Sequence, residues 1–293
     1  MLTSIEKQWL AEQFPLFVKP RPEQSHKGTF GTLNIIGGSA GMTGSCVLAG
    51  VAALKSGCGK VIIGFNQSPL TLQLIEHAPE LMLRQANEVI NGETPTAWVI
   101  GCGLGISSDA QLLIDRALSF VEQQQSVLID ADGLNLLAQM PLSQTLSSQT
   151  VLTPHPKEAA RLLQTTVTAI QADRLSAAQH LSQRFGCWAV LKGHHTIISA
   201  PNGQTWRNET GNSGLATAGS GDVLSGIIGS LLAQSLPIEE AVRAGVWLHG
   251  KAADLLIEKG IGPIGLTAHE IIDEARAIRN RATFYWCSRI DSL

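Results

Sequence analysis

The chain has 293 residues, of which 44% are hydrophobic and 15% are charged, and its formal net charge is −3. This length allows a large hydrophobic core in one or two domains. The small negative charge and the lack of a basic block argue against a nucleic-acid partner. The longest apolar runs, such as CVLAGVAALKSG, contain glycine and lysine and are too short to cross a bilayer, so we expect no membrane association.

The cysteines and the N-terminal sequence bear on the cellular compartment. Five cysteines lie at positions 46, 58, 102, 187 and 287, and no two of them are spaced as CxxC. An odd number of scattered cysteines argues against a zinc site or a disulfide framework and fits a reducing compartment. The N-terminal stretch MLTSIEKQWLAEQF contains acidic residues and no long apolar run, so it is not typical of a signal peptide. We therefore expect a cytoplasmic protein.

Residues 1–28 form a predicted lead segment, in which Pro15, Pro20 and Pro22 are expected to prevent a helix. Beyond it, short apolar or β-branched runs bounded by polar or glycine-rich turns predict buried strands. These runs cover residues 32–37, 60–64, 97–101, 126–130, 150–153 and 187–192. Helix-compatible stretches lie between them, at residues 44–57, 107–123, 156–164 and 168–185.

The last part of the chain differs from this alternation. The runs HTIIS and QTWRN surround Pro201-Asn202-Gly203 and predict a hairpin, hence an antiparallel edge. Residues 220–281 are predicted to be mostly helical. The whole pattern predicts an α/β fold, a three-layer sandwich whose mostly parallel central sheet carries helices on both faces. Without a linker, repeat or low-complexity stretch, we expect one domain over residues 1–293, with residues 1–25 as its lead segment.

Several distinctive segments directly follow predicted strands. They are Gly37-Gly38, the GCGLG loop at 101–105, Asp130 and Asp132, Pro154-His155-Pro156, and Lys192-Gly193. In open α/β sheets, ligands bind outside the carboxyl ends of the strands. We therefore expect these segments to meet around one cleft.

The segment NETGNSGLATAGSGDVLSGIIGSLLAQ (208–234) is the most informative. From Asp222 onward it is predicted to be a helix, which places Gly219 and Gly221 at the helix N-terminus. Free backbone N–H groups and the helix dipole make such a terminus an anion site. A carboxylate beside a bound phosphate can deprotonate a hydroxyl that attacks a phosphoryl group. The alternative, a tight turn with Asp222 as the helix N-cap, leaves the upstream glycines unexplained.

Other motifs are absent or ambiguous. There is no Walker loop, and the GCGLG loop alone is weak evidence for dinucleotide binding. The sequence HEIID at 269 is not HExxH, so we predict no protein-bound metal centre. Asn208, Thr210 and Asn212 are compatible with turn capping or with binding phosphates or hydrated Mg²⁺. Asp130 and Asp132 are likewise compatible with binding Mg²⁺ through water or with capping the next helix. Capping is favoured for Asp132.

Eight segments together resemble one family, the ADP/ATP-dependent NAD(P)H-hydrate dehydratases of the ribokinase-like superfamily, and the chain is similar to its stand-alone bacterial, ADP-dependent form. Besides residues 208–226, the similar segments are SHKGTFGTLNIIGGSAGMTGSCVLAGVAALKSGCGKV (25–61), IGCGLG (100–105), LIDADGLNLL (128–137), LTPHPKEAARLL (152–163), VLKGHHTII (190–198), GVWLHGKAADLL (245–256) and LTAHEIID (266–273). The resemblance implies an enzyme that phosphorylates the ring hydroxyl of the S-epimer of hydrated NADH or NADPH with ADP. Phosphate is then eliminated, which restores NAD(P)H and releases AMP and phosphate.

The resemblance also implies site residues. Asp222 would be the base, and Gly219, Ser220 and Gly221 would form the anion hole. Contacts to the hydrated dinucleotide would come from Ser45, Gly103, His155 and Asp222. The adenine nucleotide would contact Lys192, Gly193, His194, His195, Thr196 and Gly221. Mg²⁺ is expected because phosphoryl transfer needs a cation to offset developing charge.

The resemblance further implies a homotetramer. The roughly 25 residues ahead of the similar segments are too few for the epimerase domain of bifunctional relatives, so a separate NAD(P)H-hydrate epimerase is the expected functional partner. An apolar tail, FYWC at 284–287, is expected to dock on the core or on another subunit. The main alternative is a small-molecule alcohol kinase of the same superfamily, because one fold hosts many functions.

Overall fold

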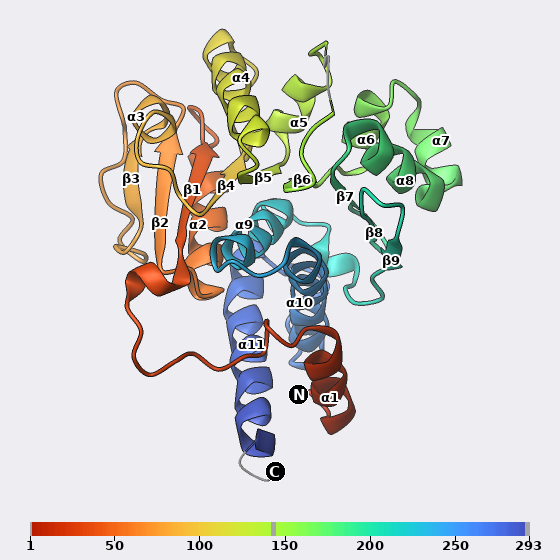
Figure 1. Ribbon diagram of the computed structural model, residues 1–293. Coiled ribbons are helices and arrows are strands. Elements are labelled where there is room, and N and C mark those ends of the chain that lie inside the picture. The colour runs from red at the N-terminus through yellow and green to blue at the C-terminus, as the bar shows by residue number, and fades with distance from the viewer. Residues whose placement is uncertain (1, 142–144, 291–293) are drawn as a thin grey trace.

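The computed structural model describes the backbone of residues 2–141 and 145–290, and the side chains of these ranges up to residue 283. Within them, nine strands form one sheet in the order β3-β2-β1-β4-β5-β6-β7-β8-β9 (Figure 1). The strands are β1 Thr32–Gly37, β2 Lys60–Phe65, β3 Met82–Gln85, β4 Ala97–Ile100, β5 Ser126–Ile129, β6 Thr150–Leu152, β7 Trp188–Leu191, β8 Ile197–Ser199 and β9 Thr205–Arg207.

The sheet confirms the predicted strands and adds one. Neighbouring strands from β3 to β7 pair in parallel, whereas β7 with β8 and β8 with β9 pair antiparallel, as the predicted hairpin requires. The strand that the sequence did not predict is β3, at the edge of the sheet. Its four residues, MLRQ, are partly or fully exposed, so they lack the apolar pattern of a buried strand.

Helices cover both faces of the sheet, which confirms the three-layer sandwich. One face carries α1 Ser4–Gln13, α2 Thr43–Lys55, α9 Ser220–Ala233, α10 Ile238–Glu258 and α11 Ala268–Ile290. The other carries α3 Ala86–Ile90, α4 Ser108–Glu122, α5 Asp132–Leu137, α6 Pro156–Leu162, α7 Val167–Ala172 and α8 Arg174–Phe185. Figure 1 shows α4 to α8 on the opposite side of the strands from α9, α10 and α11.

The strands alternate between two hydrophobic cores. In β5, the side chains of Val127 and Ile129 belong to the core under α4, while Leu128 belongs to the core under α9. All three side chains are fully buried. This alternation follows from the two-residue period of a strand, and burial on both faces explains why the strand sequences are almost continuously apolar.

Two predictions about helices were wrong. The lead segment contains α1, because its first proline, Pro15, comes only after the helix has ended. Thr3 and Glu6 form a capping box at the start of this helix. The predicted helix over 168–185 is two helices, because Asp173 ends α7 and its carboxylate caps α8 through the N–H of Ser176 at 2.9 Å. Over the described ranges, no helix combines the length and apolarity needed to span a membrane.

Helix α9 lies very close to its neighbours. It begins at Ser220, two residues before the predicted start, after Gly219 in a left-handed conformation with φ of 84°. A Cβ atom at Gly226 would lie 2.1 Å from the carbonyl oxygen of Ala49 in α2. At Gly229 it would lie 2.4 Å from Val99 in β4. Side chains larger than hydrogen would therefore displace α9 from α2 and the sheet.

Candidate functional site

A cavity of about 660 Å³ opens beyond the carboxyl ends of β6 and β7, at the N-terminus of α9. Its walls come from the loop after β6, the loop after β7, residues 208–217, the start of α9 and one side of α10. Eight predicted site residues line it: His155, Lys192, Gly193, His194, His195, Thr196, Ser220 and Gly221. The other four, Ser45, Gly103, Gly219 and Asp222, are not among the lining residues.

The inner end of this site, which we define as Asp130, Lys192, Ser225 and Asp222, is built around a buried ion pair. The ammonium of Lys192 donates to Oδ1 of Asp130 at 2.6 Å, and the hydroxyl of Ser225 donates to Oδ2 at 2.7 Å. The side chain of Asp130 is 2% exposed and that of Lys192 is 18% exposed. Burial alone would lower the pKa of Lys192, but the carboxylates of Asp130 and Glu158 outweigh it and raise this pKa, so the lysine is charged.

The N-terminus of α9 meets this ion pair. A Cβ atom at Gly221 would have only two heavy atoms within 4 Å, the Lys192 ammonium nitrogen at 3.4 Å and Asp130 Oδ2 at 3.9 Å. An anion held by the first backbone N–H groups of α9 would therefore lie beside the Lys192 ammonium. Gly219 shapes the turn, because a Cβ there would be strained at this φ and would lie 2.4 Å from Leu48.

Asp222 is the third residue of α9 and not its N-cap, a position that Gly219 occupies. Burial raises the pKa of Asp222, and the negative charge of Asp130 raises it further. Hydrogen bonds from Cys102 and Ser45 and the charge of Lys192 oppose this rise in pKa. A carboxylate with a raised pKa is a stronger base than an ordinary aspartate, provided that it is ionised.

Ser45, in the first turn of α2, and Gly103, in the loop after β4, lie next to each other. The N–H of Gly38 donates to the carbonyl of Cys102 at 2.9 Å, and the N–H of Ser39 donates to the carbonyl of Gly103 at 2.7 Å. A Cβ at Gly103 would lie 3.1 Å from Cβ of Ser45. Since Ser45 also hydrogen-bonds Asp222, the structure brings these predicted residues to the carboxylate of Asp222, next to the cavity.

His155 is the N-cap of α6 and has both ring nitrogens engaged. Its Nδ1 accepts from the N–H of Lys157 at 3.0 Å and of Glu158 at 3.3 Å, and its Nε2 lies 3.2 Å from Oε1 of Glu158. Burial and the charge of Lys192 lower the pKa of His155, so its ring is neutral at pH 7. Burial raises the pKa of Glu158 to about 7. His155 therefore presents a fixed ring to the cavity and has no free nitrogen for proton transfer.

The outer rim, which we define as His194, His195 and Glu209, is more exposed. The two imidazole rings lie with centroids 3.8 Å apart, and Nδ1 of His195 lies 2.8 Å from Oε2 of Glu209. The Glu209 side chain is 64% exposed. Gly193 has φ of 142°, and a Cβ there would lie 2.8 Å from the guanidinium of Arg174. The backbone of this strip is therefore shaped by a glycine, and its side chains face solvent.

Two residues that line or support the cavity were not predicted. His249 on α10 lies 3.2 Å from the hydroxyl of Ser220, and burial lowers its pKa to about 4. Asp254 accepts from the N–H of Gly211 at 2.9 Å and from the amide of Asn212 at 3.0 Å. A lone histidine and a lone aspartate in a helical pattern give no signal from sequence alone, because each is also common as a packing or surface residue.

Asp132 was predicted to cap a helix, and this prediction was wrong. It is the first residue of α5, after Ala131 as N-cap, and its Oδ2 accepts from the N–H of Gly105 at 2.9 Å. It therefore fixes the GCGLG loop. Burial raises the pKa of Cys102 well above its usual value, which supports packing over nucleophilic chemistry. The side chains of the 284–287 tail lie outside the described residues.

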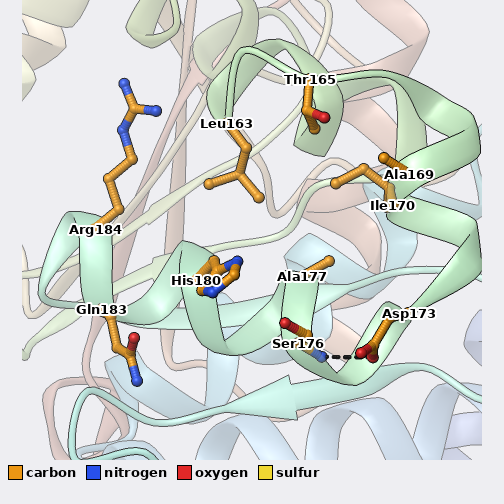
Figure 2. A pocket seen from close by; sticks show the side chains of 10 residues that line it. All are labelled: Leu163, Thr165, Ala169, Ile170, Asp173, Ser176, Ala177, His180, Gln183 and Arg184. Carbon is orange, nitrogen blue, oxygen red and sulfur yellow. Dashed lines mark hydrogen bonds between the residues drawn. The ribbon is translucent and has the colours of Figure 1, made fainter.

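A second cavity, of about 570 Å³, lies between α6, α7 and α8. Figure 2 shows its lining residues, among them His180 and Arg184 of α8, and the capping bond from Ser176 to Asp173. None of the predicted site residues lines it. The cavity at the N-terminus of α9 is therefore the candidate functional site.

Comparisons with known proteins show the family to which this chain belongs. Residues 33–276 match the family model described as NAD(P)H-hydrate dehydratase. The chain is 50% identical over 276 residues to the ADP-dependent (S)-NAD(P)H-hydrate dehydratase of Neisseria meningitidis, covering 93% of each chain. It is 40% identical over 274 residues to the bifunctional NAD(P)H-hydrate repair enzyme Nnr of Escherichia coli, covering 92% of this chain and 52% of that enzyme.

The chain thus spans about half the length of such bifunctional relatives. Among solved structures, it resembles the ADP/ATP-dependent NAD(P)H-hydrate dehydratase of Bacillus subtilis, co-crystallised with ATP and Mg²⁺. The TM-score is 0.81 at 31% identity, over 94% of this chain and 97% of that one. These matches confirm the predicted ribokinase-like fold. With most of its length matched at these identities, the chain belongs to the NAD(P)H-hydrate dehydratase family.

Proposed function

We propose that this protein is an ADP-dependent (S)-NAD(P)H-hydrate dehydratase, which repairs NADH and NADPH whose nicotinamide ring has added water. The relative from Neisseria meningitidis, similar over 93% of the chain, bears this name. The structural observation that carries the proposal is the inner end of the site. There the N-terminus of α9 and the Lys192 ammonium meet beside Asp222, a half-buried carboxylate whose pKa is raised.

The first step transfers a phosphoryl group. Asp222 accepts the proton of the ring hydroxyl, and the hydroxyl oxygen forms a bond to the terminal phosphorus of ADP. The bond from that phosphorus to the bridging oxygen breaks, and AMP leaves. The backbone N–H groups of Ser220 and Gly221 and the charge of Lys192 stabilise the transferring phosphoryl group. Positioning and electrostatic stabilisation account for most of the catalysis of phosphoryl transfer.

The second step is an elimination. The carbon–oxygen bond of the phosphorylated hydrate breaks and phosphate departs, while the neighbouring ring carbon loses a proton and the double bond returns. His155 is not suited to accept this proton, because both of its ring nitrogens are engaged. Its role in the proposal is to hold the dinucleotide, together with Ser45 and Gly103.

Magnesium supplies charge neutralisation in phosphoryl transfer. Among the described side chains, no group of three or more His, Cys, Asp or Glu residues could hold a metal ion. Mg²⁺ commonly keeps several waters and binds through substrate phosphates with few protein ligands. We therefore propose that Mg²⁺ enters with the nucleotide, in keeping with the ATP and Mg²⁺ of the Bacillus subtilis crystals.

Three further assignments belong to the proposal. A cytoplasmic location fits a repair enzyme whose substrates are soluble cofactors, and a homotetramer is the assembly that the family resemblance implies. An NAD(P)H-hydrate epimerase is the proposed functional partner, which would convert the other hydrate form. The bifunctional relatives, about twice as long, support this pairing of activities.

The alternative, an alcohol kinase of the same superfamily, would share the fold and the base. It would release a phosphorylated product. The 50% identity to a dehydratase over nearly the whole chain favours dehydration.

The decisive experiment combines purified protein, Mg²⁺ and hydrated NADH with ADP or ATP and follows the return of dihydronicotinamide absorbance. We expect recovery with ADP, with AMP and phosphate in equal amounts. Recovery with ATP alone would contradict the proposed donor. A stable phosphorylated product without recovery would contradict dehydration and favour the kinase.

A further inference from the structure

Asp130 has no assigned role in the proposed reaction, yet it is the most buried charged group of the inner end. It follows β5 directly, and its two carboxylate oxygens each accept a short hydrogen bond from a different part of the chain. Lys192 lies 62 residues away in sequence and Ser225 lies 95 residues away. The buried carboxylate of Asp130 therefore connects the loop after β7, through Lys192, to α9, through Ser225.

We propose that Asp130 is a positioning residue, which holds the Lys192 ammonium beside Gly221 through Oδ1 while Ser225 fixes the carboxylate through Oδ2. This inference rests on the proposed dehydratase function and assigns a further residue to that site. It concerns the placement of a charge and involves no covalent step.

The geometry explains why Lys192 needs such a partner. A lysine side chain has a long flexible stem and a compact charge, so its ammonium is poorly fixed by packing alone. Here Asp130 Oδ1 lies 2.6 Å from the ammonium, and a Cβ at Gly221 would be 3.4 Å from the same nitrogen. A buried ammonium that lost this carboxylate would be left uncompensated in a low-dielectric environment.

Asp130 has a second effect, on the base itself. Its negative charge is the main raising influence on the pKa of Asp222 after burial. The other groups that face the inner end are Ser45, Cys46, Cys102, His155, Glu158 and His249. Removal of the Asp130 charge should lower the pKa of Asp222, so that the fall in activity at acidic pH begins at a lower pH.

The test uses Asp130→Asn, which keeps the side-chain shape and removes the charge. The matched control is Asp115→Asn, at an exposed position of α4. At the pH plateau, we expect the kcat of Asp130→Asn to fall about 10- to 100-fold, as for loss of a charged hydrogen bond. The acidic limb of its pH profile should move to lower pH, which a merely structural role would not cause. A plateau kcat within about two-fold of wild type would overturn the proposal.

A double-mutant cycle tests whether Asp130 acts through Lys192. If it does, Asp130→Asn combined with Lys192→Met should have the same plateau kcat as Lys192→Met alone. If the two losses multiply in full, Asp130 does not act through Lys192. Should Asp130→Asn fail to fold, Ser225→Ala is tested in its place. This variant removes the hydrogen bond to Oδ2 of Asp130 and retains the charges of Asp130 and Lys192. A several-fold lower kcat with an unmoved acidic limb would then support the proposal, and an unchanged kcat would overturn it.

Nucleotide binding separates this inference from the proposed function. The preference of the protein for ADP over adenosine, measured by calorimetry, does not require dehydratase turnover. A correctly placed Lys192 favours ADP, so we expect Asp130→Asn to weaken that preference. If Asp130→Asn removed the negative charge without displacing Lys192, the preference for ADP over adenosine would become stronger. That outcome would overturn the inference. Wild-type protein that binds ADP but restores no absorbance would contradict only the dehydratase proposal.

Discussion

The inner end and the outer rim of the cavity contain residues that are neighbours in sequence, Lys192 and His195, but whose surroundings differ in burial. Lys192, at the inner end, is buried against Asp130, whereas His195, three residues later, pairs with a largely exposed Glu209. Buried charges interact strongly because little water screens them, and exposed pairs contribute little. The comparison therefore fits the proposal that the inner end carries the chemistry and the outer rim contacts the nucleotide.

The largest effect is expected for Asp222→Asn, which removes the base and keeps its shape. Turnover should fall by about 10²- to 10⁴-fold, the usual contribution of a general base. Nucleotide affinity should stay close to that of wild type. Initial rates from the absorbance assay and calorimetric ADP binding measure both effects. Near-normal turnover would remove Asp222 from its proposed role.

A smaller effect is expected for Lys192→Met. Loss of a charged hydrogen-bonding partner should reduce kcat/KM by about 10- to 100-fold and also leave Asp130 buried without its counter-ion. A lower melting temperature should accompany the loss of rate. Lys157→Met, which changes an exposed lysine of α6, is the matched control. Equal behaviour of the two variants would contradict a special role for the inner end.

Glu158 links the inner end to pH through stability. Its folded-state pKa of about 7 is raised above its ordinary 4.5, so the protonated form is favoured in the folded state. The stability that this group contributes is therefore fully present below pH 4.5 and is lost as the pH rises through about 7. Glu158→Gln should flatten this dependence. Melting temperatures of both proteins between pH 5 and 8 provide the comparison, and parallel curves would contradict the raised pKa.

The smallest effect is expected at the outer rim. His195→Ala removes a partly exposed contact with Glu209, so ADP affinity should fall by about three-fold or less, with kcat unchanged. Glu209→Gln should give a similar result. If either variant lowered kcat more than Lys192→Met does, the distinction between inner end and outer rim would fail.

Much of the fold was predictable from sequence because its strands are buried on both faces. The runs at 32–37 and 126–130 carry apolar side chains toward two cores, which gives them an unmistakable composition. Edge strand β3 and the short helix α3 lack such a signal, since neither is long enough to show a period. Helix α1 was not predicted, because prolines disfavour a helix in the lead segment, but all three prolines follow α1 in sequence.

The candidate site was predictable only in part. Parallel topology brings the carboxyl ends of strands together, which correctly placed His155 and Lys192 near the N-terminus of α9. The partners of individual side chains were not predictable. Nothing in the sequence pairs Asp130 with Ser225 across 95 residues, or directs Asp132 to the N–H of Gly105. Such pairings depend on side-chain directions that only the folded chain defines.

The close contact of α9 with α2 has a consequence for how this protein tolerates mutation. Gly226 and Gly229 lie five and eight residues beyond Gly221, about 7 and 12 Å along the helix axis, and neither lines the cavity. A larger residue at either position would shift the helix whose first turn holds the anion. In a library of random variants selected for cofactor repair, inactivating substitutions should therefore extend along α9 into the core. Positions intolerant of change would then trace a helix rather than outline a pocket.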